Sequence, residues 1–538
     1  MPIKTTKIYE RNIMNTQRKQ LSRAWEQYER GKEFKRRIGL YDTVKTNERY
    51  YRGEQWQYGE GKNLPHPVFN IIGRVINYLV CSVCSSDVTI RYDDETLPYI
   101  TSASEAEAIE NGIATLSSNA SYRWKKDGMD NVMLKLLTDA AISGDGVLYC
   151  YWDTQKKGSL AFEGDIVTDR IDNVNVFPAD VNKADIQSQE YIILSGRASV
   201  SSLIAEAERF GASAADIKSI CSDDEAAYQA GELSKYELSG DDEAKATYII
   251  KFWRENGKVV FEKSTRNCVI HRARTDCRLY PIVHFNWTPA KNSFHGASPI
   301  SSLIANQKFI NRAYAMAMKH MTDTAFSKVI YDKSKIPEWT NEVGEAIAAY
   351  GGGNISDSVS VLGVGEMQSG YMDLINSAVL LTKELMGATD SALGIVEANN
   401  TSAILALQET SRIPLEQIRS AYYRAIEQLA NVWADMMCAY YPNERLVPYY
   451  SKDRVLAKSI DFSTLKNHIL SAEIDVCEVS RYSATSVQNM LDKLLDGGFI
   501  SAEQYVKRLP IGTTLDKDDL IEAIKLTSEN KALKEEQL

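Results

Sequence analysis

The sequence predicts an α+β protein that is mainly helical. Through the first ~290 residues, strand patterns alternate with helical patterns, and after Trp287-Thr-Pro289 the pattern becomes almost wholly helical. The chain has 538 residues, and single hydrophobic cores stop growing near ~250–300 residues. Several folded units are therefore expected.

Besides a short helix that ends in the aromatic segment Tyr50–Trp56, the N-terminal half contains four helical patterns, in which apolar residues recur every three or four positions. They cover about residues 14–40, 69–84, 102–119 and 124–143. Gly144-Asp-Gly146 ends the last helix, because glycine interrupts helical structure. Strands are predicted at 147–152, 164–172, 191–195, 246–255, 259–264 and 269–274.

In the C-terminal half, Ser298-Pro299 begins a helix that continues to about Asp323, since proline is tolerated in a first helical turn. After it come short strands and a small helix over ~325–366, a helix at 371–386, a polar loop from Gly387, and a very long helix to about Tyr440. Pro414 predicts a kink or a restart inside that long helix. Residues 441–480 are predicted to be extended, and three helices close the chain at 484–495, 501–508 and 516–530.

Charge and hydropathy exclude several classes of protein. The net charge of −10 argues against nonspecific coating of nucleic acid, which needs a basic face. The first forty residues are basic, whereas the stretch around 223–243 and the C-terminal tail are acidic. No secretory signal is visible, and the apolar stretch 68–83 is interrupted by Arg74. We therefore expect a soluble protein that is made and used in a cytoplasm.

The search for catalytic motifs finds none. The phosphate-binding GxxxxGK[ST] loop, HExxH and GxSxG are absent. Cys81 and Cys84 form a CxxC pair, which we interpret as core thiols at a buried helix end rather than as a zinc or redox site. His271 and His284 are interpreted as satisfied sheet histidines, and the acidic clusters as solvated faces rather than cation sites. We therefore expect no catalytic residue, no metal and no cofactor.

Five segments, in this order, resemble elements of the bacteriophage portal protein family, the head-to-tail connectors. The core of the likeness is Gly296-Ala-Ser-Pro-Ile300, which leads into a helix that carries Gln307 and Asn311-Arg312. The other matching segments are Tyr50-Tyr-Arg-Gly-Glu-Gln-Trp56, 63–77, Leu279-Tyr-Pro-Ile-Val283, and Leu393-Gly394 to Pro414-Leu415. The resemblance covers about residues 40–440.

The resemblance implies a ring-forming portal fold with wing, stem, clip and crown regions. The implied regions are a basic N-terminal arm (1–40), an α+β wing (41–298), a first stem helix (299–324), a clip (325–368), a second stem helix (369–386), a tunnel loop (387–402), a long wing helix (403–440), an extended connection to the crown (441–480), and a helical crown with a tail (481–538).

The family's function implies the role and partners expected here. The chain would be a structural subunit of a homo-oligomeric, dodecameric ring at one capsid vertex, which conducts double-stranded DNA during packaging and ejection without reading its sequence. Its partners would be the large terminase subunit, a head-completion or adaptor protein, and the major capsid and scaffolding proteins, with no membrane. It would reside in the virion, and in the host cytoplasm during assembly.

Candidate site residues follow from the same alignment of regions. The tunnel loop would present Asp390, Leu393, Glu397, Asn399 and Asn400 to the channel. Lys308, Arg312 and Lys319 would make weak phosphate contacts from the first stem helix, or would instead form a solvated face or ion pairs between subunits. The clip candidates for terminase docking are Lys333, Lys335, Glu338 and Trp339.

Two alternatives remain open at this stage. Another virion structural protein, such as a capsid or connector subunit, would not need the order of helix, insert, helix, polar loop and long helix that residues 299–440 predict. A nucleic-acid enzyme, such as a terminase subunit, would need the missing phosphate loop or a carboxylate triad.

Overall fold

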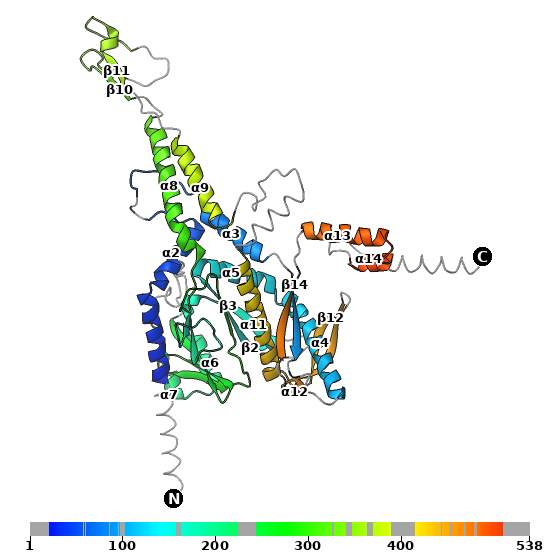
Figure 1. The fold of residues 1–538 in the computed structure, drawn as a ribbon. Helices are drawn as coiled ribbons and strands as arrows, with labels where there is room; N and C mark the ends of the chain where they lie inside the picture. Colours follow the sequence, from blue (N-terminus) through cyan, green and yellow to red (C-terminus); the bar gives the residue numbers. More distant parts are fainter. Residues whose placement is uncertain are drawn as a thin grey trace, which may run out of the picture.

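The computed structural model describes residues 21–508 with internal gaps (Figure 1). The gaps are at 58, 60, 85–86, 95, 97–102, 158–162, 224–243, 325–327, 340–346, 363–369, 389–414, 443, 452–453, 467, 469 and 478–480. Helices and strands both occur over the described residues, so the α+β prediction is confirmed.

A first helix covers 21–37, and the later helices follow in chain order. They are α2 (Leu40–Arg52), α3 (Ile71–Val83), α4 (Ala103–Lys126), α5 (Met129–Ser143), α6 (Val200–Arg209), α7 (Ala214–Ile217), α8 (Pro299–Thr324), α9 (Gly370–Glu384), α11 (Glu416–Tyr440), α12 (Phe462–Leu465), α13 (Arg481–Asp496) and α14 (Ala502–Arg508).

Two sheets form most of the body. The five-stranded sheet has the order β4-β5-β6-β7-β8, and the three-stranded sheet has the order β3-β2-β9. Their strands are β2 (Asp145–Lys157), β3 (Glu163–Ile171), β4 (Val176–Pro178), β5 (Tyr191–Ser199), β6 (Lys245–Glu255), β7 (Lys258–Ser264), β8 (Val269–Arg274) and β9 (Ile282–Asn286). All pairings in both sheets are antiparallel.

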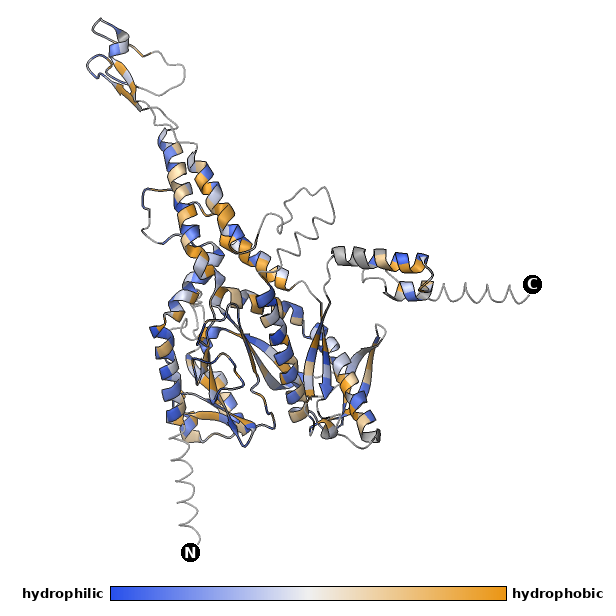
Figure 2. Ribbon diagram, in the orientation of Figure 1, coloured by the Kyte–Doolittle hydropathy of each residue, from blue (hydrophilic) through white to orange (hydrophobic). Residues whose placement is uncertain are grey.

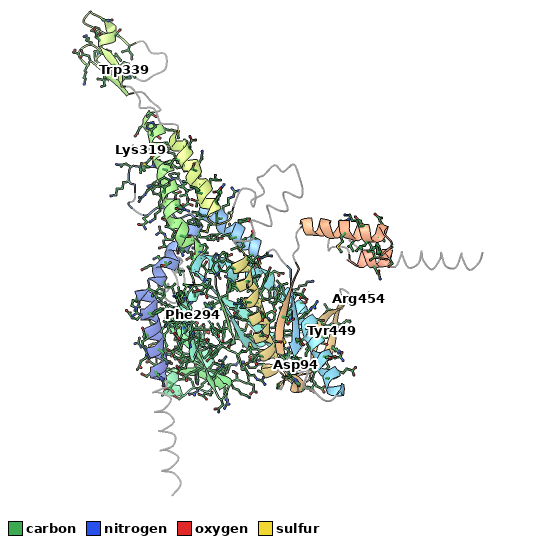
Figure 3. All side chains as sticks on the ribbon, viewed as in Figure 1. Asp94, Phe294, Lys319, Trp339, Tyr449 and Arg454 are labelled. Carbon is green, nitrogen blue, oxygen red and sulfur yellow. The ribbon has the colours of Figure 1, made fainter. Side chains whose placement is uncertain are left out.

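The remaining strands of the described residues form three two-stranded sheets. One pairs β1 (Asp87–Asp94) with β14 (Leu470–Cys477), although these strands lie at opposite ends of the described chain. The others pair β10 (Lys328–Tyr331) with β11 (Val359–Leu362), and β12 (Glu444–Ser451) with β13 (Arg454–Asp461). Tyr449 and Arg454 mark the β12–β13 hairpin in Figure 3, beyond α4 at the edge of the body.

The main hydrophobic core surrounds α11. Ile426, Leu429, Ala430 and Trp433 of this helix are fully buried, in one cluster with residues of α3, α5 and β2. The Trp433 indole donates a hydrogen bond to Thr168 Oγ1 of β3 at 3.0 Å, so its polar atom is satisfied despite burial. This helix therefore holds together segments that are distant in the sequence.

The helix over 21–37 packs on the five-stranded sheet. Trp25 and Tyr28 are buried, and the Tyr28 ring contacts Phe177 edge to face at 4.9 Å. Gly31 allows this approach, because a Cβ atom there would lie 2.7 Å from the Phe177 ring. The apolar residues of this helix thus face the sheet, while residues 1–20 lie outside the described part.

Two helices project from the body as an antiparallel hairpin, α8 and α9, and carry the small β10–β11 sheet at their far end (Figure 1). A 3-10 turn at Ile355–Asp357 precedes β11. Gly351, Gly352 and Gly353 all have positive φ, which only glycine adopts readily. The predicted order of helix, short strands and helix is confirmed for the described residues.

Some boundaries were predicted wrongly. The helix expected at 124–143 begins only at Met129, because α4 continues to Lys126 and Gly128 (φ 62°) separates the two. The helix expected from 403 is described from Glu416, and Pro414 lies outside the described residues. The described residues between 441 and 477 are mostly in strands, as expected, except for the short helix α12. The helix expected at 516–530 also lies outside.

One prediction about the cysteines is wrong. Cys84 is half-buried at the end of α3, but Cys81 is exposed and is not a core thiol. Position 81 lies on the side of α3 away from Ile76, Leu79 and Val83, which carry the buried face. Within the described part of the chain, no helix carries the long apolar run that a bilayer crossing requires.

Candidate functional site

The base of the projecting hairpin is fixed by a buried carboxylate. Asp145, at the first position of β2, is 1% exposed. It accepts hydrogen bonds from His295 Nδ1 at 2.6 Å, Gly296 N at 2.6 Å and Asn286 Nδ2 at 2.9 Å. Burial alone would raise the pKa of Asp145, but hydrogen bonds and charge from His284 and His295 lower it well below its usual value. A charged carboxylate thus holds the loop that enters α8.

Two glycines allow the backbones to meet at this point. A Cβ atom on Gly144 would lie 2.5 Å from the Gly296 carbonyl oxygen, and one on Gly296 would lie 2.6 Å from the Gly144 carbonyl oxygen. Ser298 adds a hydrogen bond from its hydroxyl to the Ala141 carbonyl at 2.6 Å. The end of α5 and the start of α8 are therefore locked together.

A chain of buried amides ties α8 to the N-terminal segments. Gln307 donates to the Phe69 carbonyl at 2.7 Å and to Asn311 Oδ1 at 2.9 Å. Asn311 donates to Gln55 Oε1 at 2.7 Å, and Gln55 donates to Asn70 Oδ1 at 3.0 Å. Asn70 also caps α3 by accepting from Gly73 N. These amides come from three of the segments that resembled portal elements, and the structure brings them together.

The projecting helices expose many large apolar side chains. Figure 2 shows hydrophobic positions along both α8 and α9, well away from the body. On α8 the exposed fractions reach 47% for Phe309 and 57% for Met321. On α9 Leu381 is 57% exposed, and Leu385, one residue past the end of α9, is 69% exposed. Exposed apolar area of this extent marks an interaction surface.

Residues 227–455 match the model of the P22-like portal protein family. The resemblance to portal proteins is confirmed. The matched span includes α8, the β10–β11 sheet, α9 and α11, which are the elements that carry the portal order of helix, insert and helix.

We also compared the chain with curated proteins and with solved structures. No curated protein matches this chain. Among the solved structures that match is one described as the neck of an empty GTA particle computed with C6 symmetry. It is 11% identical, covers 82% of this chain and 89% of that chain, and has a TM-score of 0.36.

The cationic residues expected on the first portal stem helix do lie on one side of α8. Lys308, Arg312 and Lys319 follow one another at spacings of four and seven residues, which keeps them on one face. Lys308 lies over the Tyr50 ring at 6.0 Å, and Lys319 pairs with Asp323 at 3.0 Å (Lys319 is labelled in Figure 3). The structure therefore supports a partly paired basic face rather than a set of unpaired cations.

The portal clip candidates gather at the far end of the hairpin. Trp339 stacks on Tyr331 of β10 with ring centroids 5.7 Å apart, and it is labelled at this end in Figure 3. Lys333 and Glu338 are exposed, whereas Lys335 is half-buried. The tunnel-loop candidates Asp390, Leu393, Glu397, Asn399 and Asn400 lie outside the described residues.

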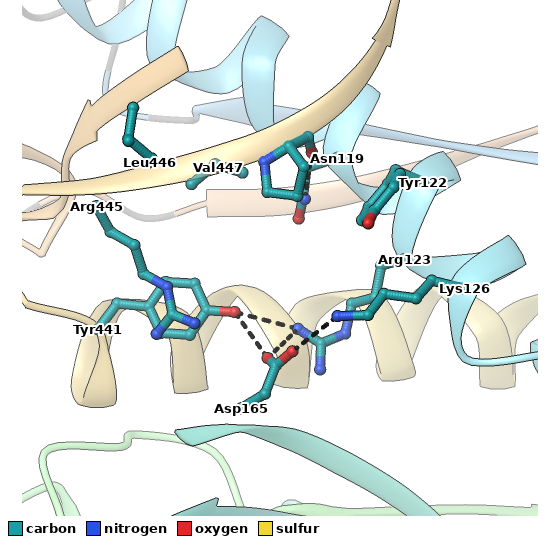
Figure 4. Close-up of a pocket in the computed structure, with 10 residues that line it drawn as sticks. Asn119, Tyr122, Arg123, Lys126, Asp165, Tyr441, Arg445, Leu446 and Val447 are labelled. Carbon is teal, nitrogen blue, oxygen red and sulfur yellow. Dashed lines mark hydrogen bonds and ion pairs between the residues drawn. The ribbon is translucent and has the colours of Figure 1, made fainter. Parts of the chain in front are cut away.

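A pocket in the body could be mistaken for an active site. Figure 4 shows it between α4, β12 and the end of α11, where the cavity is about 20 Å³. Asp165 pairs with Arg123 at 3.3 Å and Lys126 at 3.6 Å, and it accepts from the Tyr441 hydroxyl at 3.1 Å. Because the carboxylate is saturated by these partners and the space holds little more than one water, the cluster is structural.

Among the described residues, no group of three or more His, Cys, Asp or Glu side chains is arranged to hold a metal ion. His271 stacks on Phe210 at 3.7 Å, in agreement with its interpretation as a sheet histidine. His284 stacks on Phe294 at 4.2 Å, with Phe294 labelled within the body in Figure 3.

Sequence reasoning missed Asp145 and His295. Gly144-Asp-Gly146 predicts only a helix stop, and aspartate is almost never fully buried unless it is paired, so the sequence gives no sign that Asp145 is buried. Its partner His295 lies 150 residues later, so no local pattern could have joined them.

Proposed function

We propose that this chain is one subunit of a phage portal ring, which conducts double-stranded DNA through one vertex of a viral head during packaging and ejection. The match of residues 227–455 to the P22-like portal family carries the proposal. It is supported by the α8–α9 hairpin, whose exposed apolar faces need a partner in water.

In this proposal the regions keep the boundaries that the resemblance implies. The α+β body at 41–298 is the wing, α8 and α9 are the stem (299–324 and 369–386), and 325–368 is the clip. Residues 387–402 form the tunnel loop, 403–440 the long wing helix, and 481–538 the crown. Head-to-tail repetition of one interface closes into a ring, in the family a dodecamer.

The proposed role is structural, because the P22-like portal family is structural rather than enzymatic. The clip, with Trp339, Lys333, Lys335 and Glu338, docks the large terminase subunit and later the head-completion protein. The wing contacts capsid and scaffolding proteins. The protein resides in the virion, and in the host cytoplasm during assembly.

The DNA channel requires weak contacts. Each phosphate that a protein neutralises adds salt-dependent affinity, so a strongly basic lining would retard the DNA. The acidic and amide candidates Asp390, Glu397, Asn399 and Asn400 of the tunnel loop suit passage without retention, and a chain with a net charge of −10 is consistent with this.

Native mass spectrometry of the purified full-length chain tests the proposal. The expected result is a closed assembly of about a dozen copies of the 60.3 kDa subunit, with few intermediate sizes. A chain that stays monomeric at high concentration, or that forms only dimers or open-ended polymers, would count against a portal.

A further inference from the structure

The α8–α9 hairpin has two apolar flanks and two charged edges, which follow from the helical positions of its residues. The two helices of the hairpin pack against each other, and Ala313 and Ala317 of α8 and Ile375 and Thr382 of α9 are buried. At the base of the hairpin Gln307 and Asn311 of α8 are buried against Phe69 and Gln55, whereas other large apolar side chains of both helices are exposed.

The first flank, which we call the leucine flank, is continuous over both helices. Leu374 and Leu381 of α9, and Leu385 directly after its end, are spaced by seven and four residues, so they lie on one side of the helix axis. Their exposed fractions are 54%, 57% and 69%. Met316 of α8 accepts a hydrogen bond from the Tyr371 hydroxyl at 3.9 Å, which places it on the same flank.

Phe309 lies seven residues before Met316 and extends the leucine flank along α8. It is 47% exposed, and Met316 is 45% exposed. This flank therefore presents two aligned rows of large apolar side chains, one from each helix.

The opposite flank, which we call the methionine flank, carries different side chains. Met318 and Met321 of α8 are 38% and 57% exposed, and Met372 and Leu380 of α9 are 36% and 43% exposed. Helical position places these residues on the side of the hairpin away from Met316. Methionine is unbranched and flexible, so this flank can adapt to the shape of a partner.

The two edges of the hairpin are charged, and with opposite sign. The outer edge of α8 carries Lys308, Arg312 and Lys319. The outer edge of α9 carries Asp373 and Glu384, both exposed. The cations and the carboxylates thus point in opposite directions, with the apolar flanks between them.

We propose that the leucine flank of one copy packs on the methionine flank of the next copy, so that the apolar flanks form the seams of the ring and the charged edges face its axis and its outside. The occupant of each flank is a second copy of this chain. One hairpin cannot bury two opposite apolar flanks by itself, whereas head-to-tail repetition buries both in every copy. The inference rests on the proposed portal function, because it assumes a ring.

This arrangement leaves only the charged edges of the hairpin free to meet DNA. A channel wall must be wet, so an apolar flank there would remain exposed to water. With both flanks in seams, the wall is a charged edge, either the basic edge of α8 or the acidic edge of α9. Because the apolar flanks occupy the seams between copies, the basic edge of one copy does not pair with the acidic edge of the next.

Thiol cross-linking of the full-length ring tests the seam. The double variant L374C/M318C places one thiol on each flank, and R312C/D373C places one thiol on each edge. After treatment with a short bis-maleimide, L374C/M318C is expected to give a ladder of covalent oligomers on a denaturing gel, up to the complete ring. R312C/D373C should give no more covalent oligomer than the parent chain, which carries only its native cysteines.

Single variants sharpen the result. A head-to-tail seam needs both thiols, so L374C alone and M318C alone should show no ladder. A cross-link that joins residue 374 of two copies in L374C alone would overturn the inference, since it would show like flanks meeting. A ladder from R312C/D373C with none from L374C/M318C, in rings seen by electron microscopy, would also overturn it and leave the portal function standing. If the parent chain forms no ring at all, the proposed function itself fails.

Discussion

Lys35 shows how a single buried charge joins the N-terminal helix to the body. Its side chain is 1% exposed, and its ammonium donates to the carbonyl oxygens of Asn173, Val174 and Val176 at 2.7–2.9 Å. Burial lowers the pKa of Lys35 to about 7, although the charges of Asp145 and Asp172 oppose this shift.

The lowered pKa of Lys35 predicts a pH dependence. Between pH ~7 and ~10 the unfolded chain retains a proton that the folded chain has released, so the free energy of unfolding rises with pH, by at most ~1.4 kcal/mol per pH unit. Calorimetry at pH 7 and pH 9 should therefore show a smaller increase, or a larger decrease, in Tm for K35M than for the parent chain. Equal changes in the two proteins would contradict the prediction.

Asn311 gives a second prediction at this scale. The variant N311A removes the donor to the buried Gln55 carbonyl oxygen and one of the two acceptors of the Gln307 amide, so the free energy of unfolding should fall by ~1–3 kcal/mol. The exposed Asn354 provides the matched control, and N354A should stay within ~0.5 kcal/mol of the parent. Thermal unfolding measures both, and equal stability of the two variants would refute the role of the amide chain.

At the residue scale, the sequence indicated which positions matter but not their partners. Gln55, Gln307 and Asn311 stood out because they belong to segments that resemble portal elements. Their mutual hydrogen bonds could not be predicted, because Gln55 and Asn311 are 256 positions apart and any buried polar partner would satisfy them equally.

At the scale of elements, a helix or strand was predicted correctly where a sequence signal lies at its own boundary. The start of α8 at Pro299 was predicted from Ser298-Pro299, since this pair is a strong local signal. The pairing of β1 with β14 was not predicted, because a strand pattern carries no information about a partner nearly 400 residues away. The break between α4 and α5 was misplaced, since the helical pattern continues across Gly128.

The junction of α5 with α8 predicts the effect of one methyl group. In G296A the new Cβ would lie 2.6 Å from the Gly144 carbonyl oxygen and 2.8 Å from Asn286 Cβ, so the start of α8 must shift. A loss of ~1–3 kcal/mol, or failure to assemble, is expected. At Gly370 of α9 a Cβ meets nothing within 4 Å, so G370A should be neutral or slightly stabilising. Similar thermal unfolding and assembly of the two variants would contradict the claim that the close contact of Gly144 and Gly296 fixes the start of α8.

At the scale of the whole molecule, the charged edges of the hairpin predict how a ring holds DNA. If the basic edge of α8 faces the axis, R312A/K319A rings should retain DNA less well than the parent. The slope of log affinity against log salt should then become shallower by about one for each phosphate that the variant ring no longer neutralises. D373N/E384Q rings serve as the matched control on the other edge. Unchanged retention in R312A/K319A, with a change in D373N/E384Q, would place α9 at the axis instead.

Cryo-electron microscopy of the purified full-length protein tests the central claim most directly. A portal subunit predicts end-on views of closed rings with about a dozen copies around an open channel, and side views in which the α8–α9 hairpins form a narrow stem below the wider body. Shells, tubes, compact dimers or rings without an axial opening would contradict the portal assignment.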